Sequence, residues 1–118
     1  MPTSHCIILA GLDDQSRSVV ESCLPNDQFK ITQVSGNEPH EQASLVVFTA
    51  TEDYRPTQEL CGSLRNRFGQ NVPLLACAGR YVFPSIRILL EADLQGLIMT
   101  PFDASEFRKK LDQMEVGI

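Results

Sequence analysis

Short apolar segments alternate with amphipathic segments along the chain. The first apolar segment, 5–10, is continuous and partly β-branched, which is typical of a strand buried on both faces of a parallel sheet. The segment after it places Val19, Val20 and Cys23 on one helical face and ends at Pro25, with an aspartate available as the N-terminal cap. The chain therefore begins with a strand, an acidic loop and a helix.

The same unit recurs along the rest of the chain. Further apolar runs predict strands at 29–34, 43–49, 72–78 and 97–99. Amphipathic spacing predicts helices at 56–69, 84–92 and 104–114, the last of them behind a capping Asp103. Segment 35–42 has turn residues and almost no apolar positions, so a second helix is expected to be short or missing there. This order predicts a doubly wound, five-stranded parallel α/β sheet in a three-layer sandwich.

Length and charge restrict the function classes. A chain of 118 residues is expected to form a single domain, 1–118, with its core at about 5–114. The net charge of −5 lacks the basic footprint of a nucleic-acid binder or of a protein held on anionic lipid. We therefore expect no nucleic-acid or membrane partner for this domain.

The apolar runs and the cysteines bear on the expected cellular location of the domain. The longest apolar runs are far shorter than the roughly 20 residues of a membrane-spanning helix. The first residues carry no basic stretch before the apolar run, so no secretory signal is expected. The four cysteines form no CxxC pair and lie inside hydrophobic patterns, which favours reduced core residues of a cytoplasmic protein.

Loops at the carboxyl ends of parallel strands are where a site is expected. None of these loops matches GxGxxG or GxxxxGK[ST], so a dinucleotide or triphosphate cofactor is not expected. Asp13 and Asp14 offer two carboxylates that could hold Mg²⁺. The alternative is that one of them caps the following helix while the other is solvated. No cofactor is predicted, and Mg²⁺ enters only if the two aspartates act as metal ligands.

The order of segments, together with the stretch Leu97-Ile-Met-Thr-Pro-Phe-Asp103 before an amphipathic helix, resembles the receiver domain of bacterial two-component response regulators. The resemblance extends from about residue 5 to residue 114. It implies a flavodoxin-like, receiver-like fold. It also implies that the Thr100–Pro101 peptide bond is cis, a state that only an X-Pro bond adopts at modest cost.

The resemblance assigns chemical roles to positions at which this sequence departs from the family. The acceptor aspartate at the end of the third strand falls on Thr49, and the switch hydroxyl at the end of the fourth falls on Ala78. The lysine before the proline falls on Thr100, and the switch aromatic falls on Leu97. A neutral hydroxyl cannot form the acyl phosphate, and no cation remains to neutralise a phosphoryl group.

The acid pair of the family is the ambiguous position. One alignment of the first helix places Gly11 and Leu12 at the pair and leaves Asp13 at a frequent third acid. A small shift places Asp13 and Asp14 at the pair instead. With the acceptor, the hydroxyl and the lysine all missing, the sequence resembles a degenerate receiver, or pseudo-receiver, whose pocket is formed by Asp13, Asp14, Thr49, Ala78 and Thr100.

A pseudo-receiver implies a regulatory protein–protein interaction module in signal transduction or transcription regulation, independent of phosphorylation and without enzyme activity. By the same resemblance, the contact surface is the face of the fourth helix, the fifth strand and the last helix. Contact residues expected there are Ile88, Glu91, Leu94, Gln95, Leu97, Arg108 and Asp112. Arg80 and Tyr81 form a further docking candidate because aromatic and arginine side chains are enriched in interface anchors. The alternative is that several of these residues are ordinary solvated surface.

Two other functions stay open at this stage. The first is an active receiver with Asp13 and Asp14 as metal ligands and an unconventional acceptor such as Asp53. The second is a small-ligand sensor that uses the emptied pocket between Thr49, Ala78 and Thr100. For the pseudo-receiver, the expected partner is another protein or an output domain beyond this chain, and a homodimer through the same face is a further expectation.

Overall fold

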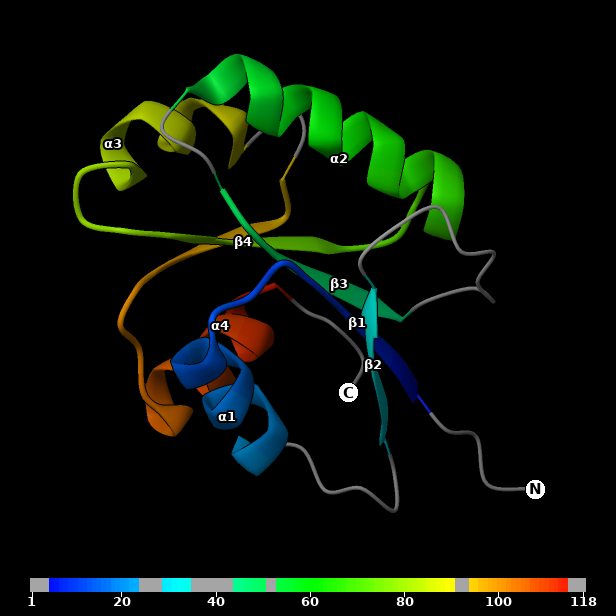
Figure 1. Ribbon diagram of the computed structural model, residues 1–118, viewed down its shortest axis with the longest axis vertical. Helices are drawn as coiled ribbons and strands as arrows, with labels where there is room; N and C mark the ends of the chain where they lie inside the picture. Colours follow the sequence, from blue (N-terminus) through cyan, green and yellow to red (C-terminus); the bar gives the residue numbers. More distant parts are fainter. Residues whose placement is uncertain (1–4, 24–28, 35–43, 51–52, 91–93, 115–118) are drawn as a thin grey trace.

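Strands and helices alternate along the computed structural model, which describes residues 5–23, 29–34, 44–50, 53–90 and 94–114. The strands are β1 (His5–Ala10), β2 (Phe29–Val34), β3 (Leu45–Thr49), β4 (Leu74–Ala78) and β5 (Gly96–Met99). The helices are α1 (Asp14–Cys23), α2 (Tyr54–Phe68), α3 (Phe83–Ile86), the 3₁₀-helix η1 (Arg87–Leu90) and α4 (Ala104–Gln113). Figure 1 shows these elements in their order along the chain.

The strands form one parallel sheet with the order β2-β1-β3-β4-β5. Helices α2 and α3 lie on one face of this sheet, and α1 and α4 lie on the other (Figure 1). The expected α/β class with a parallel sheet between two helical layers is therefore confirmed. Because β1 lies between β2 and β3, strand order reverses there, and the loops after β1 and β3 meet at the position where open α/β sheets place their sites.

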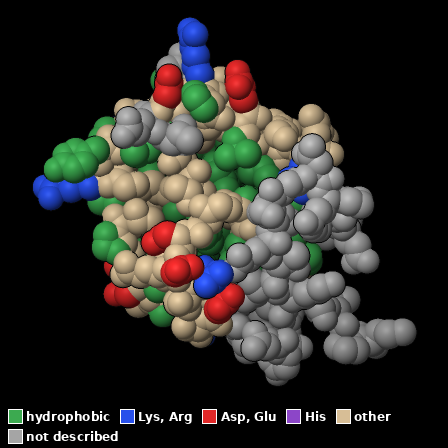
Figure 2. All heavy atoms as spheres, in the orientation of Figure 1, with side chains coloured by type: hydrophobic (Ala, Val, Ile, Leu, Met, Phe, Trp, Pro, Cys, Tyr) green, Lys and Arg blue, Asp and Glu red, His purple; other side chains and the backbone are tan. Residues whose placement is uncertain are grey.

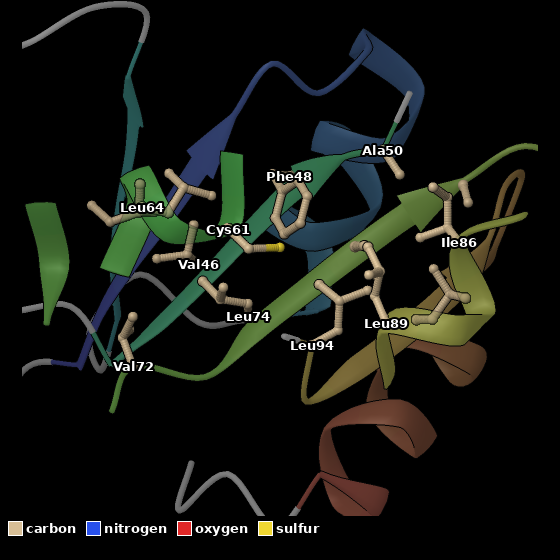
Figure 3. Close-up of a cluster of buried hydrophobic side chains, with 14 of the residues drawn as sticks. Val46, Phe48, Ala50, Cys61, Leu64, Val72, Leu74, Ile86, Leu89 and Leu94 are labelled. Atoms are coloured by element: carbon tan, nitrogen blue, oxygen red, sulfur yellow. The ribbon is translucent and has the colours of Figure 1, made fainter. Parts of the chain in front are cut away.

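Strands β3 and β4 are buried on both faces, which explains why their sequences are continuous apolar runs. Alternate side chains enter two hydrophobic clusters, one on each side of the sheet. Figure 3 shows the cluster under α2 and α3, where Val46 and Phe48 of β3 pack with Cys61 and Leu64 of α2. The second cluster joins the opposite face to α1 and α4 through Val20, Phe107 and Leu111.

The boundaries of α2 differ from the predicted 56–69 for a local reason. Asp53 is the N-terminal cap, and its side chain accepts a hydrogen bond from the backbone N–H of Arg55 at 3.2 Å. This cap starts the helix at Tyr54, so Pro56 lies within the first turn, where a missing N–H costs little. The cap of α4 agrees with its prediction, because the Asp103 side chain accepts from the Glu106 N–H at 2.8 Å.

The single helix predicted at 84–92 is wrong in form. The chain makes four α-helical residues, 83–86, and continues as a 3₁₀-helix to Leu90. Ile86 and Leu89 are both buried, and their spacing of three residues matches the repeat of a 3₁₀-helix. The backbone N–H of Leu94 then donates to the carbonyl of Leu89 at 2.9 Å, which turns the chain toward β5.

Some of the sequence-based expectations fall on segments outside the described residues, and others concern membrane-spanning helices and the cysteines. The short or missing helix at 35–42 and the end of the predicted helix at 91–92 lie outside the described residues. Within the described part of the chain, no helix combines the length and the apolar character needed to cross a membrane. All four cysteines are free thiols, and Cys23, Cys61 and Cys77 are buried.

Replacing Gly62 with alanine is expected to raise the free energy of unfolding by about 0.5–1 kcal/mol. Gly62 lies in the interior of α2, it is exposed, and an added Cβ would meet no atom within 4 Å. Alanine therefore gains helix propensity without a steric cost. Urea unfolding of the wild type and Gly62→Ala measures the difference.

Gly69 provides the matched control in the same helix. It is the C-terminal cap of α2 and has a φ of 125°, a conformation that residues with a Cβ rarely adopt. Gly69→Ala is therefore expected to lower the free energy of unfolding. Equal effects of the two substitutions would contradict the assignment of Gly62 to a regular, unobstructed helical position.

Candidate functional site

The sequence-predicted pocket lies where β1 and β3 end, at the reversal of strand order. Thr49 is the last residue of β3, and Gly11 directly follows β1 with a φ of 69°. The Thr49 hydroxyl donates a hydrogen bond to the Gly11 carbonyl at 2.9 Å. The side chain at the family's acceptor position is therefore tied to the neighbouring loop, and it offers a neutral hydroxyl in place of a carboxylate.

Asp13 and Asp14 lie at the start of α1. The Asp13 carbonyl accepts from the Arg17 N–H at 3.0 Å, as the residue before a helix does. Asp14 Oδ1 lies 3.2 Å from Arg17 Nη2, and its side chain is 94% exposed. Asp13 thus precedes the first turn of α1, and Asp14 forms a solvated ion pair with Arg17.

Receiver domains use Mg²⁺, so the donor set of this chain can be tested for that ion. Gly11 and Leu12 have no side-chain oxygen, and Thr49 offers a neutral hydroxyl in place of a carboxylate. Among the described residues, no three acidic, histidine or cysteine side chains come together as a metal site would require. These donors do not fit a receiver-type Mg²⁺ site.

Ala78, the last residue of β4, and Thr100, which directly follows β5, are brought together because the two strands are adjacent in the sheet. The Thr100 N–H donates to the Ala78 carbonyl at 2.9 Å. Ala78 is fully buried, and a Cβ at Gly79 would lie 3.9 Å from Thr100 Oγ1. The Thr100–Pro101 bond is cis in the structure. A methyl group and a half-buried hydroxyl thus occupy the positions at which the family places its switch hydroxyl and its lysine.

Cys77 is a residue near this site that sequence reasoning treated only as core. It pairs in register with Thr49 across β3 and β4, and its thiol is buried. Burial, and to a smaller extent the negative charge of Asp13, raise the pKa of this thiol to about 12. The sequence could have indicated the proximity of Cys77 to the site, because Cys77 lies near the end of a predicted buried strand and such strand ends meet the acidic loop that follows the first strand.

Asp53, the unconventional acceptor of the active-receiver alternative, has a structural role. Its side chain caps α2 through the Arg55 N–H, and its carbonyl accepts from the buried Thr57 hydroxyl at 3.2 Å. The hydrogen bonds therefore already account for an aspartate at this position.

The predicted contact residues divide by exposure. Tyr81 is 90% exposed and Ile88 is 72% exposed, and Arg80 and Asp112 are also exposed. Leu94 and Leu97 are only 2% exposed, because the side chains of both pack in the cluster under α2 and α3. Glu91 lies outside the described residues.

Two further predicted contact residues make hydrogen bonds within the domain. Gln95 Oε1 accepts from the Leu74 N–H at 2.8 Å and from Arg65 Nη2 at 3.2 Å. Arg108 Nη2 donates to the Cys23 carbonyl at 3.0 Å and so links α4 to the end of α1. These exposed polar side chains hold neighbouring elements together.

A hollow of about 280 Å³ lies on the face predicted for contacts, between α3, β5 and α4. Its lining includes apolar residues of α3 and β5 and polar residues of α4: Phe83, Leu97, Ile98, Met99, Glu106, Lys109, Lys110 and Gln113. The predicted pocket residues Thr49, Ala78 and Thr100 do not line it. Sequence reasoning named the face and missed Phe83, Met99 and the two lysines, although the lysine pair in the later part of an amphipathic helix was visible.

Charge on the surface is mixed. Figure 2 shows acidic and basic side chains in the same regions around the described part of the visible face. That face therefore does not resemble the single-sign basic surface with which proteins track a nucleic-acid backbone.

Comparisons with known proteins identify the fold. No family model and no curated protein matches the sequence. A response regulator from Thermotoga maritima superimposes with a TM-score of 0.75 at 15% identity, over 94% of this chain and 97% of that one. The receiver domain of a sensor histidine kinase from Pseudomonas aeruginosa, solved with a magnesium ion in its active-site cleft, gives 0.62 at 16% identity over 97% and 98%.

A pilus assembly protein, CpaE, from Caulobacter crescentus also has this fold. It gives a TM-score of 0.69 at 12% identity, over 91% of this chain and 90% of that one. The similar structures thus include response regulators and a protein of a different named role. At these identities the comparisons establish a receiver-type fold, and the function has to be argued from the residues of this chain.

Proposed function

We propose that this receiver-fold chain is a pseudo-receiver: a cytoplasmic regulatory module that acts through protein–protein contacts and does not accept a phosphoryl group. Its partner is another protein or an output domain, in signal transduction or transcription regulation. The module has no enzyme activity of its own. It uses the fold as a rigid frame that presents a contact surface.

The hydrogen bond from Thr49 to the Gly11 carbonyl carries this proposal. A carboxylate at this position would repel the carbonyl oxygen, whereas a hydroxyl donates to it. The same bond occupies the space between β1 and β3 where the chemistry of a receiver would take place. With Ala78 and Thr100 in place of a hydroxyl and a cation, phosphoryl transfer lacks its acceptor and its charge stabilisation.

The exposed face of α3, η1, β5 and α4 is the proposed contact surface. It presents Tyr81 and Ile88 to solvent and includes the hollow above β5. Tyr81 and Ile88 are large apolar side chains that a partner protein would cover. A homodimer through this face is the alternative arrangement of the same module.

Incubation with acetyl phosphate and Mg²⁺ is expected to add no phosphoryl group to the protein. Intact-mass spectrometry measures the product, and a phosphorylatable receiver domain treated in parallel controls the reagent. Addition of beryllofluoride with Mg²⁺ is expected to leave the amide resonances of Asp13, Thr49 and Thr100 unchanged. Phosphoryl incorporation, or a saturable shift of these resonances, would overturn the proposal.

Asp53→Asn separates the pseudo-receiver from an active receiver with an unconventional acceptor. The amide oxygen of asparagine still accepts the Arg55 N–H, so the α2 cap is expected to survive. If Asp53 is the acceptor, the wild type incorporates a phosphoryl group and Asp53→Asn does not. If the chain is a pseudo-receiver, neither protein incorporates one.

A further inference from the structure

Strand β5 is an edge strand whose outward backbone groups are open to pairing. It lies at the end of the strand order and pairs with β4 alone. The Thr100 N–H donates inward to the Ala78 carbonyl. Because alternate residues of a strand in a parallel sheet direct their N–H and C=O groups to opposite sides, Leu97 and Met99 direct theirs away from β4. Among the described residues, no hydrogen bond to these outward groups is found.

The hollow follows this edge. Its lining includes Leu97, Ile98 and Met99, which are consecutive in β5. Leu97 belongs to the cluster under α2 and α3, and Ile98 belongs to the cluster on the opposite face of the sheet. A hollow lined by residues from both faces runs along the edge of the strand. An extended peptide would therefore meet backbone donors and acceptors there.

The two sides of the hollow differ in chemistry. On the α3 side the lining residue is Phe83, which is apolar. On the α4 side, Lys109 and Lys110 accompany a single carboxylate, Glu106. Lys110 Nζ donates to Gln113 Oε1 at 3.1 Å, and no ion pair of either lysine is found within the described part of the chain. The helix side is thus positively charged in a protein whose net charge is −5.

We propose that an extended segment of a partner protein, with alternating apolar and acidic residues, adds to the free edge of β5 as the next strand of the sheet. This inference rests on the proposed function, for which it names the partner's chemistry. Successive side chains of an added strand point to opposite faces. One set then contacts Phe83, and the other set brings carboxylates to Lys109 and Lys110.

Size and charge favour this occupant over others. The hollow has a volume of about 280 Å³, which accommodates single side chains of a peptide. A second copy paired edge to edge would bring Lys109 and Lys110 of both copies to the same interface. Like charges there oppose such a homodimer, whereas an acidic segment is attracted.

A synthetic peptide in which valine alternates with glutamate tests the proposal on the intact chain. Titration is expected to shift the amide resonances of β5, α3 and α4 in a saturable way. At saturation, hydrogen exchange at the Leu97 and Met99 amides is expected to slow by about tenfold or more, because these N–H groups gain acceptors. A peptide in which valine alternates with lysine is expected to bind far more weakly.

The double variant Lys109→Glu and Lys110→Glu tests the charge of the α4 side. Lys109 is exposed and Lys110 is half-buried, so the fold is expected to persist. Reversal of both charges is expected to weaken binding of the valine–glutamate peptide by about tenfold or more. The matched control is Arg55→Glu, which changes an exposed charge of α2 outside the lining of the hollow and is expected to leave binding unchanged.

Several results would overturn the inference. They are unaltered exchange at Leu97 and Met99, equal binding of both peptides, or slow exchange that develops with protein concentration alone and so indicates a second copy. These outcomes are independent of the beryllofluoride experiment. If the peptide does not bind and beryllofluoride causes no response, only the strand-addition proposal is contradicted. A response to beryllofluoride contradicts the proposed pseudo-receiver function itself.

Discussion

Raising the pH above 9 is expected to lower the free energy of unfolding by about 1.4 kcal/mol per pH unit through one buried thiol, Cys77. Burial raises the pKa of this thiol to about 12 from the ordinary value of 9.0, and the nearby Asp13 acts in the same direction. In the unfolded chain the thiol ionises near pH 9, whereas in the folded protein it keeps its proton. The unfolded state is therefore favoured as pH rises.

The pH window follows from the two pKa values. Below pH 9 the thiol is protonated in both states, so its contribution to stability is constant. Between pH 9 and about 12 the unfolded state releases its proton first, and the free energy of unfolding falls. Above about 12 both states are ionised, and the loss reaches its limit.

Urea unfolding at a series of pH values measures the effect. Other groups also titrate in this range, so the informative quantity is the difference between the wild type and Cys77→Ala. Cys77→Ala is expected to be less stable at neutral pH, because a buried side chain becomes smaller, and to approach the wild type as pH rises. Parallel curves for the two proteins would contradict the prediction.

Replacing Gln95 with alanine is expected to lower the free energy of unfolding by about 1–3 kcal/mol. The Gln95 side-chain oxygen accepts from the N–H of Leu74, whose residue is fully buried at the start of β4, and from the Arg65 guanidinium. Without this acceptor, a buried N–H is left unsatisfied. Thermal and urea unfolding measure the loss.

Two variants separate the buried hydrogen bond from the exposed contact. Gln95→Glu keeps an oxygen for the Leu74 N–H and adds an ion pair with Arg65, so its stability is expected to stay close to that of the wild type. Arg65→Ala removes only the half-buried guanidinium partner, whose hydrogen bond to Gln95 is exposed, and is expected to cost less than about 1 kcal/mol. If Arg65→Ala and Gln95→Ala had equal effects, the bond to Leu74 would not be the stabilising one.

The Gln95 result also bears on function. Gln95 was predicted as a contact residue because it lies on the face that the resemblance to receiver domains implies for contacts, and its side chain makes hydrogen bonds to β4 and α2. Reduced partner binding by Gln95→Ala would therefore reflect a displaced β5. Exposed Ile88 on the same face offers a cleaner test of direct contact, since its side chain is 72% accessible.

Local sequence signals predicted most of the fold. Continuous apolar runs located strands that the sheet buries on both faces, and β1 and β2 have the predicted bounds. Asp103 was recognised as a cap because capping depends on residues only three positions apart. The form of 83–90 could not be predicted in this way, because the spacing of Ile86 and Leu89 fits both an α-helix and a 3₁₀-helix.

The candidate site divides in the same manner. The sequence shows that Thr49, Ala78 and Thr100 stand at strand ends where the resemblance to receiver domains implies a carboxylate, a hydroxyl and a lysine, because the residue type at the end of each strand can be read locally. It could not show that the Thr49 hydroxyl donates to a carbonyl 38 positions earlier, which depends on the register of β1 and β3.

By itself, then, the sequence determined the α/β order of elements and the Asp103 cap, since neighbouring residues decide both of these. Only the tertiary structure decided which apolar side chains of the predicted contact face are accessible. Leu94 and Leu97 turn into the core, whereas Ile88 remains exposed and a hollow opens beside β5. The physical reason is that accessibility depends on what packs against a side chain, and those partners come from helices and strands distant in the sequence.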